Sequence, residues 1–127
     1  MSGVELRDKR ALGHLMELLG IEGLSGREGK VAERVREKLI EAGCKKSWIS
    51  HDRVHRKIPG DFEIGNLIVK IPGTRRQPRR LFSGHLDTVP LCRGAVPVRK
   101  GKTALGGDNR TAVAALVNMV EELLRQD

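Results

Sequence analysis

Hydrophobic residues recur at helical spacing in three segments, which we expect to be amphipathic helices packed on a shared core. The first runs from Val4 to Leu19 and is closed by Gly20. The second follows Ser25-Gly26-Arg27-Glu28, a capping-box sequence, and stops at Gly43. The third runs from Thr111 to Leu124. The apolar positions expected to face the core are Leu12, Leu15, Met16 and Leu19; Val31, Val35, Leu39 and Ala42; and Val113, Leu116, Val117, Val120 and Leu124.

Short apolar runs between the second and third helices indicate strands. Trp48 and Ile49 begin one, and Leu67 to Ile71 and Leu81 to Gly84 read as buried strands of one sheet, separated by a basic loop. Val96 to Leu105 contains a proline and a glycine, which favour an extended loop or an edge strand. Because helices and strands alternate, we expect an α/β fold that carries helices on the faces of a mixed sheet and binds ligands beyond its strand ends.

A histidine and a carboxylate follow the last buried strand, within the stretch Arg80-Leu-Phe-Ser-Gly-His-Leu-Asp-Thr-Val-Pro90. In extended backbone, His85 and Asp87 point to the same side, because strand side chains repeat every two residues. A carboxylate that accepts one ring N–H of a histidine fixes the tautomer and makes the other nitrogen a better metal ligand. The pair alone is a weak indication of a metal site, since His-x-Asp is common at strand ends.

A second motif, Leu105-Gly106-Gly107-Asp108-Asn109-Arg110, is a glycine-rich turn that carries one carboxylate into the third helix. Together the two motifs resemble the peptidase M20 family of dinuclear zinc exopeptidases and amidohydrolases, which includes aminopeptidase T-like tripeptidases and related deacylases. Ser25-Gly26-Arg27-Glu28, Gly65-Asn66-Leu67-Ile68 and Ile71-Pro72-Gly73 agree with this pattern. The resemblance covers nearly the whole chain in family order.

The resemblance implies a partial three-layer α/β/α catalytic domain like that of the zinc exopeptidases. Residues 1–127 would be its N-terminal portion, without the family's separate dimerisation domain. It further implies that His85 binds one of two zinc ions, that Asp108 bridges both, and that Asp87 acts in catalysis by orienting His85. Cobalt and manganese are alternative metals. The implied activity is metal-dependent hydrolysis of peptides or acylated amino acids.

The family's general base belongs to a Glu-Glu pair placed well after the bridging aspartate, and a later histidine and a further acidic ligand complete the site. The one such pair here, Glu121-Glu122, lies roughly 20 Å along the third helix from Asp108, at about 1.5 Å per residue. It cannot close the site. We therefore expect a truncated chain that is inactive alone, with two alternatives: an inert metal-binding half-domain that needs complementation, or a basic nucleic-acid-binding module.

The other three histidines are not expected to bind metal. His14 falls between the apolar positions of its helix and should be exposed. His51 and His55 are four residues apart, as in His-Glu-x-x-His zinc helices, but Asp52 replaces the glutamate and Ile58-Pro59-Gly60 favours strand and turn over helix.

Charge and composition bear on the partners. The 127 residues carry a formal net charge of +8, with basic runs at Arg53 to Lys57 and Arg75 to Arg80. Aromatic residues make up 2% and tyrosine is absent, so base-stacking side chains are scarce and solvated loops are favoured over nucleic-acid contact. We expect self-association through the incomplete sheet instead, because unpaired strand edges invite pairing.

Cysteine usage and hydropathy suggest a cytoplasmic address. Cys44 and Cys92 are the only cysteines and lie at no zinc-knuckle or redox spacing, so we expect reduced structural thiols. The N-terminal residues are charged where a signal peptide would be apolar. The longest apolar run, Ala112 to Val117, is too short to span a bilayer, and no membrane partner is expected.

Overall fold

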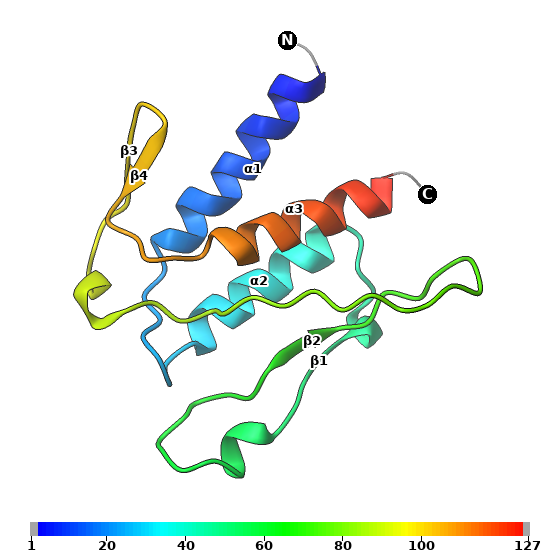
Figure 1. Cartoon of the computed structure of the whole chain (residues 1–127), viewed down its shortest axis with the longest axis horizontal. Coiled ribbons are helices and arrows are strands. Elements are labelled where there is room, and N and C mark those ends of the chain that lie inside the picture. The colour runs from blue at the N-terminus through cyan, green and yellow to red at the C-terminus, as the bar shows by residue number, and fades with distance from the viewer. Residues whose placement is uncertain (1–2, 126–127) are drawn as a thin grey trace.

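Three helices lie together in the computed structural model, which describes residues 3–125 (Figure 1). They are α1 (Gly3–Leu19), α2 (Gly29–Glu41) and α3 (Thr111–Arg125), and each packs against the other two. All three predicted helices are therefore confirmed. Within the described range, no helix combines the length and the apolar character needed to cross a membrane.

The core forms where the three helices meet. Its buried residues are Leu18, Val31, Val35, Leu39, Cys44, Val113, Ala114, Val117 and Val120. The predicted stripes of α2 and α3 supply most of them, although Leu116 and Leu124 are only half-buried. The prediction for α1 was wrong in part, because Leu12 and Met16 are half-buried while His14 and Leu18 are buried. The face of α1 that packs on the core is therefore rotated about the helix axis relative to the predicted apolar stripe, and it includes His14 and Leu18.

The two ends of α2 are closed differently. Its C-terminus is a Schellman motif: Gly43 has φ +107°, and the amides of Gly43 and Cys44 donate to the carbonyls of Ile40 and Leu39, both at 2.9 Å. The predicted capping box does not form at the N-terminus. Glu28 Oε1 instead accepts from the Gly26 amide at 2.9 Å, and the Gly29 amide donates to Glu63 Oε2 at 2.9 Å.

Two small antiparallel sheets accompany the helices. β1 (Ile49–His51) pairs with β2 (Leu67–Val69), and their apolar side chains pack against the core. β3 (Val98–Lys100) and β4 (Thr103–Leu105) form a hairpin beside α1 (Figure 1). The described residues therefore form a small mixed α/β structure with three helices and two antiparallel sheets, in place of the expected single mixed sheet.

The predicted buried strand Leu81 to Gly84 is the main correction to the fold. These residues form no ladder within the described part of the chain, and Leu81 and Phe82 are 93% and 56% exposed. The apolar composition is that of a strand, but burial of a strand needs neighbours on its edges and faces. The nearest strand-like pairing is a single parallel bridge between Leu24 and Thr88.

His14 is also corrected, since it is 8% exposed and lies between all three helices. Its Nε2 lies 2.9 Å from Glu121 Oε1 on α3, and its Nδ1 lies 3.1 Å from Lys38 Nζ on α2. Because an ammonium group can only donate, Nδ1 accepts and the ring hydrogen on Nε2 is donated to Glu121. Lys38 also donates to Glu17, which binds Arg34 as well. Sequence periodicity could not show this, because the partners lie on other helices.

Glu17 should stabilise the fold only where it is ionised. The hydrogen bond from Arg34, supported by Lys38, lowers the pKa of Glu17 below its ordinary value. A lowered folded-state pKa gives stability that is present above the unfolded value and lost as the pH falls through the lowered pKa. We expect Glu17→Gln to lower the melting temperature by roughly 3 °C near neutral pH and by less near about pH 3.

Glu33→Gln is the matched control, because the ion pair that Glu33 forms in the described part of the chain is an exposed one, with Arg36 at 3.0 Å on the same helix. Thermal melts of both variants and the parent at the two pH values make the comparison. Equal destabilisation by Glu17→Gln at both pH values would contradict the assignment of this ion pair as the source of the effect.

Candidate functional site

The extended backbone that follows Gly84 carries the two expected side chains of the first motif. His85 Nδ1 lies 3.0 Å from Asp87 Oδ1 and 3.0 Å from the Asp87 carbonyl oxygen. With two acceptors at this distance, Nδ1 carries the hydrogen and donates it, which leaves the lone pair on Nε2. The His85 side chain is 54% exposed, so the ring is oriented by Asp87 and accessible from solvent.

Asp108 lies in the loop before α3, next to the loop of the first motif. The Val89 amide donates to the Asp108 carbonyl oxygen at 3.3 Å, which joins the two loops. The Asp108 side chain is exposed, and its Oδ1 lies 3.4 Å from Asn109 Nδ2. The two loops are adjacent, but in residues 3–125 no three histidine, cysteine, aspartate or glutamate side chains form a group that could hold a metal ion.

Arg110 organises the backbone beneath this site. Its side chain is completely buried, and its guanidinium donates to four carbonyl groups. Nε donates to the carbonyl oxygen of Leu86 at 2.8 Å, and Leu86 is the residue between His85 and Asp87. Nη2 donates to the carbonyl oxygen of Gly23 at 3.2 Å. Nη1 donates to Leu18 and Ile21. Burial lowers the pKa of Arg110, and the charge of Asp87 opposes that shift; an arginine nevertheless stays charged in a protein.

Gly23 connects the α1–α2 loop to both motifs. Its carbonyl oxygen accepts from Arg110 and also from Thr88, whose amide lies at 2.9 Å and whose Oγ1 lies at 3.2 Å. A Cβ on Gly23 would lie 2.6 Å from Arg110 Nη2, so the guanidinium can approach only a glycine here. Three loops therefore converge on one side chain to which sequence reasoning assigned no role, because its acceptors lie 24 to 92 residues away.

The remaining candidates have structural surroundings. Glu121 is buried against His14, and Glu122 lies 3.2 Å from Arg125 on the same helix, so both contribute to the packing of α3. His51 lies at the end of β1 and His55 lies in the 3-10 turn Val54–Arg56, so the two do not share a helical face. Asp52 accepts from the Asn66 side chain at 2.8 Å, and this hydrogen bond lowers the pKa of Asp52.

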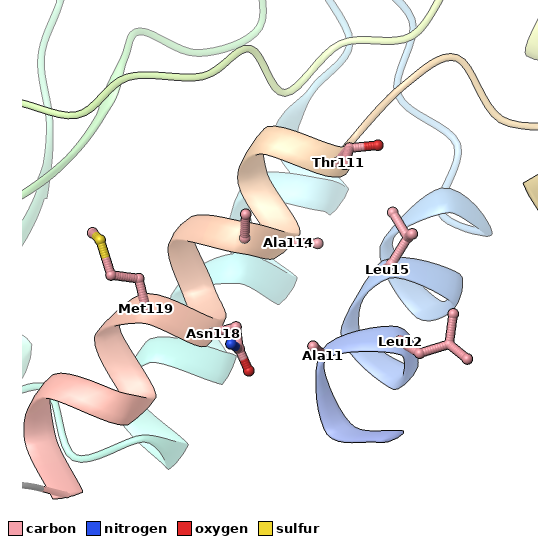
Figure 2. Close-up of a pocket in the computed structure, with 8 residues that line it drawn as sticks. Ala11, Leu12, Leu15, Thr111, Ala114, Asn118 and Met119 are labelled. Carbon is pink, nitrogen blue, oxygen red and sulfur yellow. The ribbon is translucent and has the colours of Figure 1, made fainter. Parts of the chain in front are cut away.

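A separate groove of about 430 Å³ lies between α1 and α3 (Figure 2). Leu12 and Leu15 project from α1, and Asn118 and Met119 project from α3. The other lining residues are Ala11, Thr111, Ala114 and Ala115. No residue that lines the groove is ionisable, so this hollow offers neither metal ligands nor a catalytic acid or base.

The comparisons with known proteins give no relative for this arrangement: no family model, no curated protein and no solved structure matches the chain.

Replacing Arg110 should weaken the whole fold rather than the exposed site alone. Arg110→Lys keeps the charge but cannot reach four divergent carbonyl oxygens, and it leaves some of them buried without donors. We expect the free energy of unfolding in urea to fall by about 3 kcal/mol. Arg93→Lys, at an exposed position close to the same loop, is the control and should change little. Equal midpoints for the two variants would refute the anchoring role.

Proposed function

We propose that this chain supplies metal-binding residues to a zinc-dependent hydrolase of peptide or N-acyl amide bonds, of the M20 type. The observation that carries the proposal is the contact between His85 and Asp87. A histidine whose Nδ1 is held at 3.0 Å by a carboxylate while its ring stays exposed has the arrangement of a metal ligand with its orienting partner. The order of the two motifs along the chain supports the same class of enzyme.

The ligand atoms that this chain offers are of types that bind zinc, but there are fewer of them than a complete zinc site uses. His85 Nε2 and the Asp108 carboxylate would hold the metal, and imidazole nitrogen with carboxylate oxygen is a common zinc ligand set. Established sites use three or four protein ligands, so one or more must come from elsewhere. When bound, zinc would lower the pKa of a water molecule and polarise the scissile carbonyl.

The chain's own residues would prepare this site. Asp87 fixes the His85 tautomer, and Arg110 fixes the Leu86 carbonyl between those two residues. The Val89 amide holds the Asp108 backbone beside the same loop. In this proposal, β1, β2 and the extended residues 79–84 belong to a larger mixed sheet of a three-layer α/β/α domain, and the missing base and ligands come from polypeptide outside these residues.

Metal binding should depend on His85 and on its orientation. We expect zinc to bind the parent weakly, because two ligands are fewer than a complete site uses. His85→Ala should abolish the binding, and Asp87→Asn should weaken it by about tenfold, since an amide cannot replace the carboxylate as acceptor and charge. Isothermal titration measures each affinity. His51→Ala, which removes an exposed histidine from β1, is the control. Indistinguishable titrations of the parent and His85→Ala would defeat the assignment.

Hydrolysis should be absent from the isolated chain. The only Glu-Glu pair in the sequence is Glu121 and Glu122, and both are committed to the packing of α3. We therefore expect dipeptides, tripeptides and acylated amino acids with added zinc to be cleaved no faster than in buffer with zinc. Rapid cleavage by pure protein that disappears in Asp108→Ala would show that a general base is present among these residues.

A further inference from the structure

The groove between α1 and α3 has the size and the apolar wall of a small-molecule site (Figure 2). Alanine, leucine and methionine side chains make up its wall except for Thr111 and Asn118. Its volume of about 430 Å³ lies within the range of known ligand pockets, about 300–1,000 Å³. From Thr111 to Asn118 the wall extends about 10 Å along α3, at about 1.5 Å per residue. The groove can therefore hold a short aliphatic chain.

A second hollow, of about 150 Å³, extends from the groove to the β3–β4 hairpin. Leu12 and Leu15 line both hollows, so the two meet on α1. The hairpin adds Arg99 and Lys102 to the lining, and both side chains are exposed. Neither forms an ion pair with a carboxylate within residues 3–125. An apolar groove thus leads to two cations that have no anionic partner in the described part of the chain.

The groove lies on a different side of α3 from residues 79–84. A Cβ on Gly84 would lie 3.0 Å from Ala112 Cβ and 3.7 Å from Leu116 Cδ1, so that backbone passes over these two positions. The α3 residues that line the groove are Thr111, Ala114, Ala115, Asn118 and Met119. At about 3.6 residues per turn, they are centred roughly a third of a turn away from Ala112 and Leu116. A sheet completed along residues 79–84 therefore does not fill the groove.

Charge complementarity indicates which apolar ligand fits. A carboxylate at the end of an aliphatic chain would lie beside Arg99 and Lys102 while the chain lies on apolar side chains. An aliphatic cation would instead be repelled by these two residues and by the net charge of +8. Because exposed ion pairs contribute little free energy, the chain supplies most of the affinity and the carboxylate supplies the preference among ligands.

We propose that the groove and the adjoining hollow together bind an aliphatic monocarboxylate. The chain lies between α1 and α3 and across Leu12 and Leu15, and the carboxylate lies beside Arg99 and Lys102. The proposal requires no metal and does not depend on the function proposed above.

The test titrates decanoate into the whole chain by isothermal calorimetry, below the concentration at which decanoate forms micelles and with a metal chelator present. Butanoate, which has the same head and a shorter chain, should bind far more weakly, because each buried methylene strengthens binding by up to about fourfold. Decylammonium, which has the same chain and the opposite charge, should also bind more weakly than decanoate. Added salt should reduce the difference between decanoate and decylammonium, since it screens exposed charges.

Filling the groove should exclude the chain. Ala115 is an exposed lining residue, so Ala115→Leu adds volume to the groove without disturbing the core, and it should weaken decanoate by about tenfold. Ala11→Leu fills the same groove from α1 and should have the same effect. Gly13→Leu is the control: a Cβ there meets nothing within 4 Å, and the position lies roughly half a turn around α1 from the groove. It should bind decanoate like the parent.

Reversing one hairpin charge should remove the preference for the carboxylate. Lys102→Glu should weaken decanoate by about fivefold and bring its affinity closer to that of decylammonium. Lys100→Glu is the matched control, because it changes the net charge equally at an exposed position of β3 that does not line the hollow. Circular dichroism and thermal melts of every variant check that the fold is kept.

Three results would overturn the proposal. Equal affinities for decanoate and butanoate, unchanged by Ala115→Leu and Ala11→Leu, would reduce the effect to attraction between an anion and a basic protein. Equal losses from Lys102→Glu and Lys100→Glu would show that the carboxylate does not lie beside the hollow. Sedimentation that shows a dimer of the parent, dissociated by Ala115→Leu, would make a second copy of the chain the occupant of the groove.

Discussion

The burial of one guanidinium is the constraint on which the arrangement of the loops depends. Arg110 is fully buried and forms no ion pair with a carboxylate among residues 3–125, so carbonyl dipoles must balance its charge. Its guanidinium donates to four carbonyl groups, which belong to the end of α1, the α1–α2 loop and the first motif. If one of these loops moved alone, a buried N–H group of Arg110 or a backbone carbonyl would lose its hydrogen bond. The Arg110 side chain thereby fixes the three irregular segments relative to one another, as the hydrogen bonds of a sheet fix its strands.

The packing of the three helices depends on a second set of buried, hydrogen-bonded polar side chains. His14, Lys38 and Glu121 come from α1, α2 and α3, and His14 hydrogen-bonds to both of the others across the interface, whereas Glu121 Oε2 has no hydrogen-bond partner among the described residues. Apolar contacts tolerate small rotations of a helix, but hydrogen bonds between buried groups form only within a narrow range of geometry. Two polar clusters, one between the helices and one beneath the loops, therefore set the packing of a core that consists mainly of small aliphatic side chains.

Local pattern was enough to predict the helices and the positions of β1 and β2, because amphipathic period, turns and glycine stops depend on neighbouring residues, but it did not predict that these two strands pair with each other. It failed where the deciding partner is distant in sequence. His14 is buried by Glu121, 107 residues away, and α2 is capped by Glu63, 34 residues away. At the site, the motif spacing indicated His85, Asp87 and Asp108. It did not indicate a role for Arg110, because the carbonyl groups that accept from Arg110 are also distant in sequence. Residues 81–84 have the composition of a buried strand, and composition cannot provide the strands that would bury it.

His85 lies where backbone that is fixed by hydrogen bonds meets backbone that is not. On its C-terminal side, Leu86 is fixed by Arg110 and Thr88 by Gly23; on its N-terminal side, the amides before it make no backbone hydrogen bonds within the described residues. A metal ligand, which is the role we propose for His85, needs an orientation more exact than such a boundary provides. The contact from Asp87 supplies it from the fixed side, since this carboxylate lies between Leu86 and Thr88. The spacing of two residues therefore matters for a reason beyond side-chain direction: it places the orienting group on backbone that the buried arginine has already ordered.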